Sequence, residues 1–210
     1  IKTDQEIDSM RKGGKILATV LEEVCKRALS GVSTYELDQF AEKFILDSGG
    51  RPGFKGYHGF PASLCTARNQ VIVHGIPKKD EFLEEGDLFT ADCGVIYDGL
   101  YTDAARSLGI GKISSEKERL LKTAEKALYA AIDLIKPGIH VSEISKTIEN
   151  IVKNAGFHII HDLTGHGVGR SLHEEPVVLN YWDGNPGPIL KAGMTLAIEP
   201  IFSAKTSKMR

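Results

Sequence analysis

A predicted β-hairpin at residues 91–107 (ADCGVIYDGLYTDAARS) constrains the fold more than any other stretch of the sequence. One apolar run enters it, a second run leaves it, and Asp98-Gly99 lies between them. This dipeptide favours the positive φ angles of a two-residue turn. The pattern therefore predicts two antiparallel strands in a fixed register.

Two carboxylates share one face of this hairpin. In the predicted register Asp92 faces Ala105, and Asp103 lies on the same face one diagonal step away, roughly 7–8 Å distant at Cα. Like charges beside apolar neighbours repel each other and resist desolvation. A divalent metal between them would relieve both costs, because carboxylate oxygens are hard ligands that can bridge two ions. The alternative, from the hairpin alone, is an exposed turn with two hydrated aspartates.

Composition gives no sign of a nucleic-acid or membrane partner. Of the 210 residues 41% are apolar and 26% are charged, and the net charge is -2. Such a balance offers no basic patch for nucleic acid, and no apolar run approaches the roughly 18 residues of a spanning helix. The three cysteines form no C-x-x-C pair, which is typical of reduced thiols in the cytoplasm.

An internal repeat divides the chain into two related halves, about 1–110 and 111–210. Amphipathic helices are predicted to begin near Thr3, Ser33, Ser115 and Ser142. At an offset of 107 residues the second helix pair falls on the first, and FLEEGDLFTAD (82–92) falls on ILKAGMTLAIE (189–199). Asp92 then matches Glu199, so each half supplies a carboxylate from the same strand position. A chance similarity of two amphipathic halves is the alternative.

The segment between the first helix pair and the hairpin is predicted to be a loop followed by two strands. Residues 51–63 (RPGFKGYHGFPAS) are rich in Gly, Pro and aromatic residues, which favours a loop shaped for close approach. Residues 64–73 are expected to form two short strands, the second closed by His74-Gly75-Ile76-Pro77.

Three of the seven histidines lie among glycines and prolines. His166 and His173 lie in TGHGVGRSLHEEP (164–176), and His74 lies in VHGIP. Glycine-rich backbone occurs where a ligand or another strand comes close, and imidazole is a common ligand for transition metals. No H-E-x-x-H, G-x-S-x-G or Walker pattern is present. The thermolysin-like, serine-hydrolase and P-loop classes are therefore excluded.

Four motifs in this order, NQVIVHGIP, the Asp92/Asp103 hairpin, TGHGVGRSLHEEP and MTLAIEP, resemble type I methionine aminopeptidase. The resemblance covers nearly the whole chain. It implies a pita-bread fold of the α/β (α+β) class, with pseudo-two-fold symmetry and an antiparallel sheet flanked by two helix pairs. The implied activity is removal of N-terminal methionine from nascent polypeptides whose second residue is small.

The resemblance also implies roles for individual residues. Asp92 and Asp103 match the bridging metal ligands, and His166 and Glu199 match a histidine and a glutamate ligand of the family. The implied cofactors are two divalent metal ions, Co, Mn, Fe or Zn, because a mixed histidine and carboxylate set suits all four. Glu199 would also act as the proton shuttle.

The remaining implied roles concern the substrate. His173 would donate to the tetrahedral oxyanion, and His74 would orient the substrate or assist the departing amide; neither binds metal. The methionine side chain would enter a pocket built from Tyr57, His58, Phe60 and Cys65. Phe54 and Leu172 stand where family members often differ.

The expected partners are the N-termini of nascent polypeptides, with the ribosome as a further candidate; we expect a cytoplasmic monomer. One alternative function is a proline-directed aminopeptidase or dipeptidase of the same fold. Another is a metal-free pita-bread module that binds protein or peptide. The intact Asp92, Asp103, His166 and Glu199 argue against the module, because burying those carboxylates without a metal is costly.

The resemblance and the repeat make the same prediction about the C-terminal end. Family members continue to a final strand that carries a further bridging glutamate, and the repeat places the mate of Asp103 at position 210. We therefore expect 1–210 to be a single catalytic domain that lacks this strand, and the natural protein to continue beyond Arg210.

Overall fold

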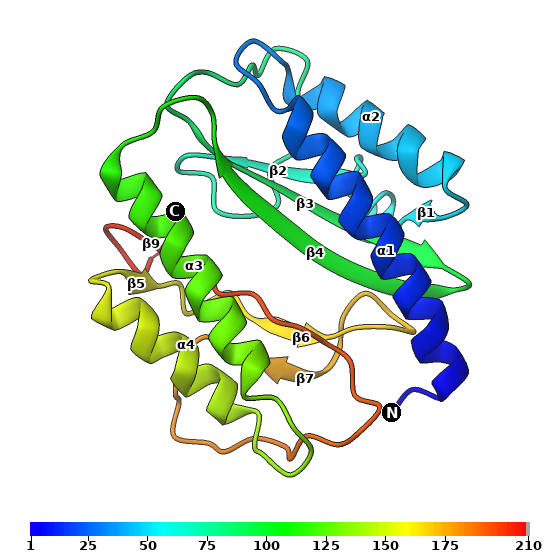
Figure 1. The fold of residues 1–210 in the computed structure, drawn as a ribbon, viewed down its shortest axis with the longest axis vertical. Coiled ribbons are helices and arrows are strands. Elements are labelled where there is room, and N and C mark those ends of the chain that lie inside the picture. Colours follow the sequence, from blue (N-terminus) through cyan, green and yellow to red (C-terminus); the bar gives the residue numbers. More distant parts are fainter. Residues whose placement is uncertain (209–210) are drawn as a thin grey trace. The chain divides into compact units, whose positions relative to one another are not determined.

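The computed structural model describes residues 1–208, which form helices and antiparallel strands in two compact units (Figure 1). The hairpin unit comprises Asp4–Lys117 and Gly169–Leu172. The histidine unit comprises Ile1–Thr3, Glu118–Val168 and the chain from His173 onward. No helix within residues 1–208 has both the length and the hydropathy required to cross a membrane.

The sheet of the hairpin unit is built around strand β3 (Leu88–Tyr97). β4 (Leu100–Gly109) pairs along one edge of β3, and β2 (Leu64–Arg68) and β1 (Arg51–Pro52) pair along the other. The predicted register is confirmed, because Asp92 faces Ala105. The turn is also as expected, with φ of 52° at Asp98 and 78° at Gly99.

Two helices cover this sheet, α1 (Asp4–Arg27) and α2 (Thr34–Asp47) (Figure 1). Ser33 and Glu36 form the reciprocal capping box that starts α2. α1 runs so close to the hairpin that a Cβ at Gly13 would lie 3.1 Å from Cβ of Tyr97. The core between helices and sheet includes Leu17, Val20, Leu21, Val24, Leu37, Ile45, Phe89 and Val95.

The prediction of two strands within residues 64–73 is wrong for the second. β2 ends at Arg68, and Asn69 has a φ of 53°, which breaks the extended backbone. The chain then returns beside β2, where the Thr66 N–H donates to the Gly75 carbonyl at 2.8 Å. A Cβ at Gly75 would lie 1.9 Å from the Thr66 oxygen, so only glycine allows this approach.

The histidine unit contains most of α3 (Ser115–Asp133) and all of α4 (Ser142–Asn154). Strand β6 (Gly165–Gly167) pairs with β7 (Glu174–Val178) on one side and β8 (Leu196–Ala197) on the other. A second, two-stranded sheet pairs β5 (His158–Ile159) with β9 (Phe202–Ser203). The core of the histidine unit includes Ala127, Ala131, Ile144, Ile148, Val152 and Phe157.

Several backbone features recur at the offset of 107 residues found in the sequence. Isolated β-bridges join Ser33 to Phe82 in the hairpin unit and His140 to Ile189 in the histidine unit. Glycines with positive φ occupy matching positions: Gly31 and Gly138, Gly49 and Gly156, Gly86 and Gly193. Position 210, the expected mate of Asp103, lies outside the described residues.

Candidate metal site and side-chain pocket

The hairpin brings Asp92 and Asp103 to one face of its sheet. Asp92 faces Ala105 and Asp103 faces Gly94, two residues further along β3, so the carboxylates are diagonal neighbours. Both side chains are half-buried. Their field reaches Cys65, whose pKa is raised mainly by burial and then by these two charges. The two carboxylates thus lie on one face beside Cys65, where a cation would reduce their mutual repulsion.

An apolar cluster lies on the same face of the sheet, at the predicted side-chain pocket. Cys65 pairs directly with Asp92 across β2 and β3, and partners in register point to the same side. Buried Phe54 and Leu172 pack with Cys65, and half-buried side chains complete the cluster: Tyr57, Phe60 and Tyr101. Three of the four residues predicted to line the pocket therefore come together.

His58 differs from the other three predicted pocket residues because its side chain is exposed. Its φ is 47°, inside a single turn of 3-10 helix, η1 (Tyr57–Gly59). Its ring lies edge-on to Tyr57, with the two centroids 4.4 Å apart.

Sequence reasoning missed Tyr101 as a member of the apolar cluster. The alternation of β4 could have found it, because residues 101 and 103 point to the same face of the strand.

Two close approaches shape this cluster. A Cβ at Gly94 would lie 2.7 Å from the Phe54 ring, so this glycine makes room for the aromatic side chain. On the other side, the Tyr101 N–H donates to the Gly169 carbonyl at 2.6 Å, which ties residues 169–172 to β4. Leu172 reaches the cluster through this attachment.

His74 lies in the segment that returns beside β2. Its side chain is exposed and its φ is 57°, an uncommon conformation for a residue other than glycine. The bond from Thr66 to Gly75 fixes the backbone next to it. Uncommon backbone geometry that the surroundings enforce is often found at functional positions.

His166 lies in the middle of β6, between two strands that approach very closely. A Cβ at Gly165 would lie 2.3 Å from the Ala197 oxygen of β8, and a Cβ at Gly167 would lie 2.3 Å from the Glu175 oxygen of β7. The glycines on either side of His166 are therefore a steric requirement. The sequence expectation that another strand comes close to this segment is confirmed.

The His166 ring has a defined orientation and a carboxylate neighbour. Nδ1 lies 2.8 Å from the Gly167 carbonyl, which can only accept, so Nδ1 carries a proton. Nε2 lies 3.1 Å from Oε1 of Glu199, just beyond β8. A neutral ring would present a lone pair from Nε2 to the carboxylate lone pairs of Glu199. Either a protonated ring that donates from Nε2 or a cation held between the two groups removes that conflict. Imidazole nitrogen and carboxylate oxygen are both common ligands of divalent metals, so the pair is a candidate metal site.

His173 lies beside this pair. Its ring centroid is 4.3 Å from that of His166, and the two planes are inclined by 65°. It immediately precedes β7, whose first residue, Glu174, forms an ion pair with the buried Lys2. The N-terminal segment therefore anchors the first residue of the strand that follows His173.

The cysteines do not provide a thiolate nucleophile. All three are free thiols, and burial is the main cause that raises the pKa of each of Cys25, Cys65 and Cys93. Reactive cysteines require a lowered pKa, so catalysis by these thiols is disfavoured.

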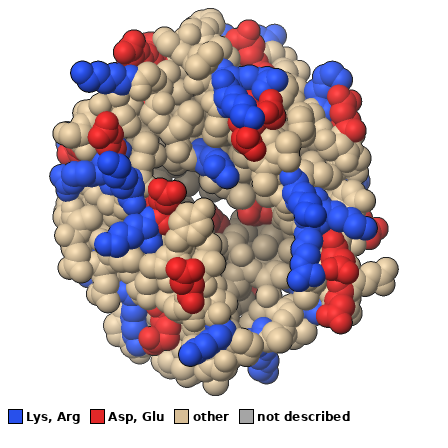
Figure 2. Space-filling view, viewed as in Figure 1, with Lys and Arg blue, Asp and Glu red and all other residues tan. Residues whose placement is uncertain are grey.

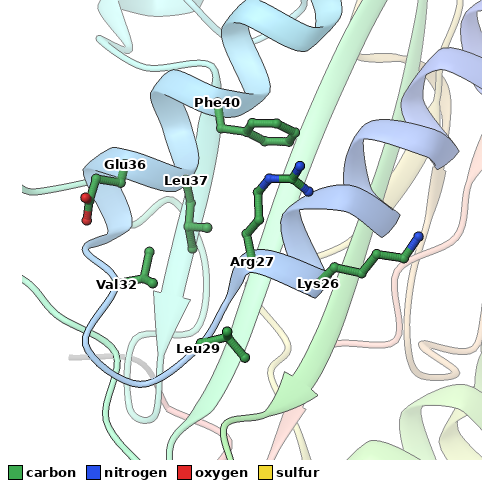
Figure 3. A pocket seen from close by; sticks show the side chains of 7 residues that line it. All are labelled: Lys26, Arg27, Leu29, Val32, Glu36, Leu37 and Phe40. Carbon is green, nitrogen blue, oxygen red and sulfur yellow. The ribbon is translucent and has the colours of Figure 1, made fainter.

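A groove of about 320 Å³ lies elsewhere on the hairpin unit, between the end of α1 and the start of α2 (Figure 3). Its side chains include Leu29, Leu37 and Phe40, and the Arg27 guanidinium lies 4.0 Å from the Phe40 ring centroid. Arg27 also forms an ion pair with Glu23 at 2.5 Å. None of the predicted site residues lines this groove.

Comparisons with known proteins identify the family. Residues 8–209 match metallopeptidase family M24. A methionine aminopeptidase from Clostridium acetobutylicum is 43% identical over 206 residues, covering 98% of this chain and 82% of that protein. The structure of a methionine aminopeptidase from Thermotoga maritima matches with a TM-score of 0.97 and 38% identity, covering 99% of this chain and 84% of that one.

A more distant match is a prolidase from Pyrococcus furiosus, with a TM-score of 0.81 and 25% identity over 94% of this chain and 56% of that one. The mixture of helices and antiparallel strands agrees with the pita-bread fold expected from the sequence. The family match and the identity to the curated relative show that this chain belongs to metallopeptidase family M24.

Proposed function

We propose that this protein is a metal-dependent methionyl aminopeptidase, a hydrolase that removes N-terminal methionine from polypeptides whose second residue is small. Relatives named methionine aminopeptidase are 38–43% identical over nearly the whole chain. The prolidase shares 25% identity, so the proline-directed alternative has weaker support. Membership of a metallopeptidase family disfavours a metal-free binding module. The carboxylates of Asp92, Asp103 and Glu199 also argue against it, because burying them without a metal is costly.

The observation that carries the proposed site is the contact of His166 Nε2 with Glu199 Oε1 at 3.1 Å. A nitrogen ligand beside an oxygen ligand suits Mn, Fe, Co or Zn better than Mg or Ca. We infer that Asp92 and Asp103 complete the ligand set, and that two such ions are bound. The likeness of Asp92 to Glu199 in the internal repeat supports their joint role.

When bound, the metal ions supply a Lewis acid and lower the pKa of a water molecule. Glu199 would accept a proton from the attacking water and pass it to the departing amine. An N–H of His173 stabilises the negative charge that develops on the carbonyl oxygen, and His74 orients the scissile amide. The carboxylates also attract the free α-amine, which distinguishes an N-terminus from an internal peptide bond.

The pocket formed by Phe54, Cys65 and Leu172, with the half-buried aromatic rings around it, receives the methionine side chain. A thioether makes favourable contacts with aromatic rings, and its unbranched shape fits a narrow apolar pocket. His58 contacts the rim of this pocket through Tyr57.

We propose a cytoplasmic monomer that acts on nascent chains, with the ribosome as a candidate partner. The free cysteines support a reducing compartment. On the face shown in Figure 2, basic and acidic side chains are interspersed, without a basic patch that would suit nucleic acid.

The test compares peptide products before and after removal of metal. The protein is treated with a chelator, and divalent metal is then restored in the presence of Met-Ala-Ser, Met-Leu-Ser or Ala-Pro-Ser. We expect release of methionine from Met-Ala-Ser, slower release from Met-Leu-Ser, and loss of both with the chelator. Cleavage of Ala-Pro-Ser in preference to both methionine peptides would establish the proline-directed alternative. Metal-independent peptide binding without hydrolysis would establish the module.

A further inference from the structure

Helix α2 carries a buried carboxylate that reaches the end of the pocket loop, residues 53–63. Asp38 is 4% exposed, and its Oδ1 accepts from the N–H of Ser63 at 2.8 Å and of Leu64 at 2.9 Å. Leu64 is the first residue of β2 and directly precedes Cys65. Asp38 therefore fixes the backbone where the loop enters the strand that carries a pocket residue.

A second acid on α2 holds the same loop near its beginning. Glu42 accepts from the Lys55 ammonium at 2.6 Å and from the Ser63 hydroxyl at 3.2 Å. Residues 38 and 42 lie one turn apart on one face of the helix. The two acids thus hold both ends of the segment that contains Tyr57 and Phe60.

The pocket loop is a tight turn whose ends are attached to α2. Gly56 and Gly59 have φ angles of 87° and 82°, and the turn is closed within the loop by the Gly56 N–H, which donates to the Phe60 carbonyl at 2.8 Å. These bonds set the shape of the turn, whereas the bonds to Asp38 and Glu42 attach the loop to the helix. A buried carboxylate is costly unless it is hydrogen-bonded, and two backbone donors satisfy Asp38. An apolar residue beside Leu37 and Ala41 would pack in the core without holding the loop.

We propose that Asp38 and Glu42 are positioning residues that fix the pocket loop and thereby determine which substrate side chain the pocket accepts. The identity of that side chain, methionine, rests on the proposed function. Neither acid contacts the substrate; both act through the backbone and side chains of the loop. Their loss widens the pocket and admits branched side chains.

The test measures the ratio of kcat/KM for Met-Ala-Ser to that for Leu-Ala-Ser. This ratio is independent of the fraction of protein that is folded, so a purely structural role would leave it unchanged. We expect the ratio to fall by about tenfold in Asp38→Ala, the scale on which apolar pockets discriminate shape. Asp38→Asn retains an acceptor for both N–H groups and should restore the ratio to within about twofold of the parent.

Asp87→Ala is the matched control. Asp87 is also a buried aspartate of the hairpin unit, 5% exposed, and accepts from a backbone N–H, that of Glu84, at 2.8 Å. Its side-chain partners are Arg68 and Asn69, which lie outside the pocket loop. This variant should lose stability and keep the parent ratio. An unchanged ratio in Asp38→Ala, or equal changes in both variants, would overturn the proposal.

A second measurement separates this inference from the proposed function. Amide hydrogen exchange should accelerate at Ser63 and Leu64 in Asp38→Ala and not in Asp38→Asn. A parent protein that releases no methionine refutes the proposed function, whereas unchanged exchange in Asp38→Ala refutes the positioning role. If Asp38→Ala does not fold, Glu42→Gln replaces it, with an expected two- to threefold fall in the ratio; no change there overturns the proposal.

Discussion

Replacing Gly167 by alanine should damage both the stability of the protein and its proposed metal site. The new Cβ would lie 2.3 Å from the Glu175 oxygen, whereas real Cβ contacts essentially never fall below 3.0 Å. The obstructing atoms belong to the backbone of β7 and cannot rotate away. The strands would have to separate by several tenths of an ångström at the pair Gly167 and Glu174, next to His166.

The size of the effect follows from the interactions lost. Overpacking typically costs about 1–3 kcal/mol, and each lost backbone hydrogen bond adds about 1 kcal/mol. We expect a loss of about 2–4 kcal/mol in the free energy of unfolding, or a Tm lowered by roughly 5–15 °C. Because β6 carries His166, the affinity for divalent metal should also fall.

Thermal unfolding and metal titration of Gly167→Ala provide the assay, with Gly14→Ala as the control. Gly14 lies within α1, and among the described residues nothing comes within 4 Å of an added Cβ. The control should gain about 0.5–1 kcal/mol, the helix propensity of alanine over glycine. A Gly167→Ala protein with the stability and metal affinity of the parent would refute the steric explanation of the GHG motif.

Two further predictions concern single side chains. His173→Ala should lower kcat by roughly 10²–10³ and leave metal content at the parent value, as expected for loss of an oxyanion donor; loss of metal would show that its role was misassigned. Burial acts to raise the pKa of Asp87, but donation from Arg68, the Glu84 N–H and Asn69 outweighs it and lowers the pKa. The stabilising charge is then present above the unfolded-state pKa of about 3.9, and is lost as pH falls through the lower folded-state value. Urea unfolding of the parent and Asp87→Asn should show a stability difference that is constant above about pH 5 and shrinks below about pH 4; a difference that grows on acidification would contradict this sign.

The hairpin was predictable because its signals are local. Asp98-Gly99 specifies the turn, and the alternation of the strands then determines which residues face Asp92. The segment after β2 was not predictable in the same way. Its course depends on a positive φ at Asn69 and on the pairing of Thr66 with Gly75, and a short apolar run contains neither signal.

The residues of the candidate site also differ in whether a local sequence signal identifies them. His166 was found because its flanking glycines indicate close approach, which the contacts with β7 and β8 explain. The pocket is less evident from the sequence, since Leu172 joins it through a bond between Tyr101 and Gly169 that links distant parts of the chain. The sequence did not identify Asp38 as a buried residue. A charged residue in an amphipathic helix is usually assigned to the solvent-exposed face, whereas Asp38 lies on the buried face of α2.

The central claim is that Asp103 is a metal ligand, and titration of metal-free protein with Mn²⁺ tests it most directly. Asp98→Asn is the control, because Asp98 lies on the same hairpin but accepts from Ser9 at the turn, at 2.7 Å, and asparagine tolerates its positive φ of 52°. Asp103→Ala should bind Mn²⁺ at least about 100-fold more weakly than the parent, beyond the effect of an outer-shell group. Its metal-free form should be at least as stable as the parent, because a like charge beside Asp92 is removed. Parent-like Mn²⁺ affinity and methionine release in Asp103→Ala would contradict the account.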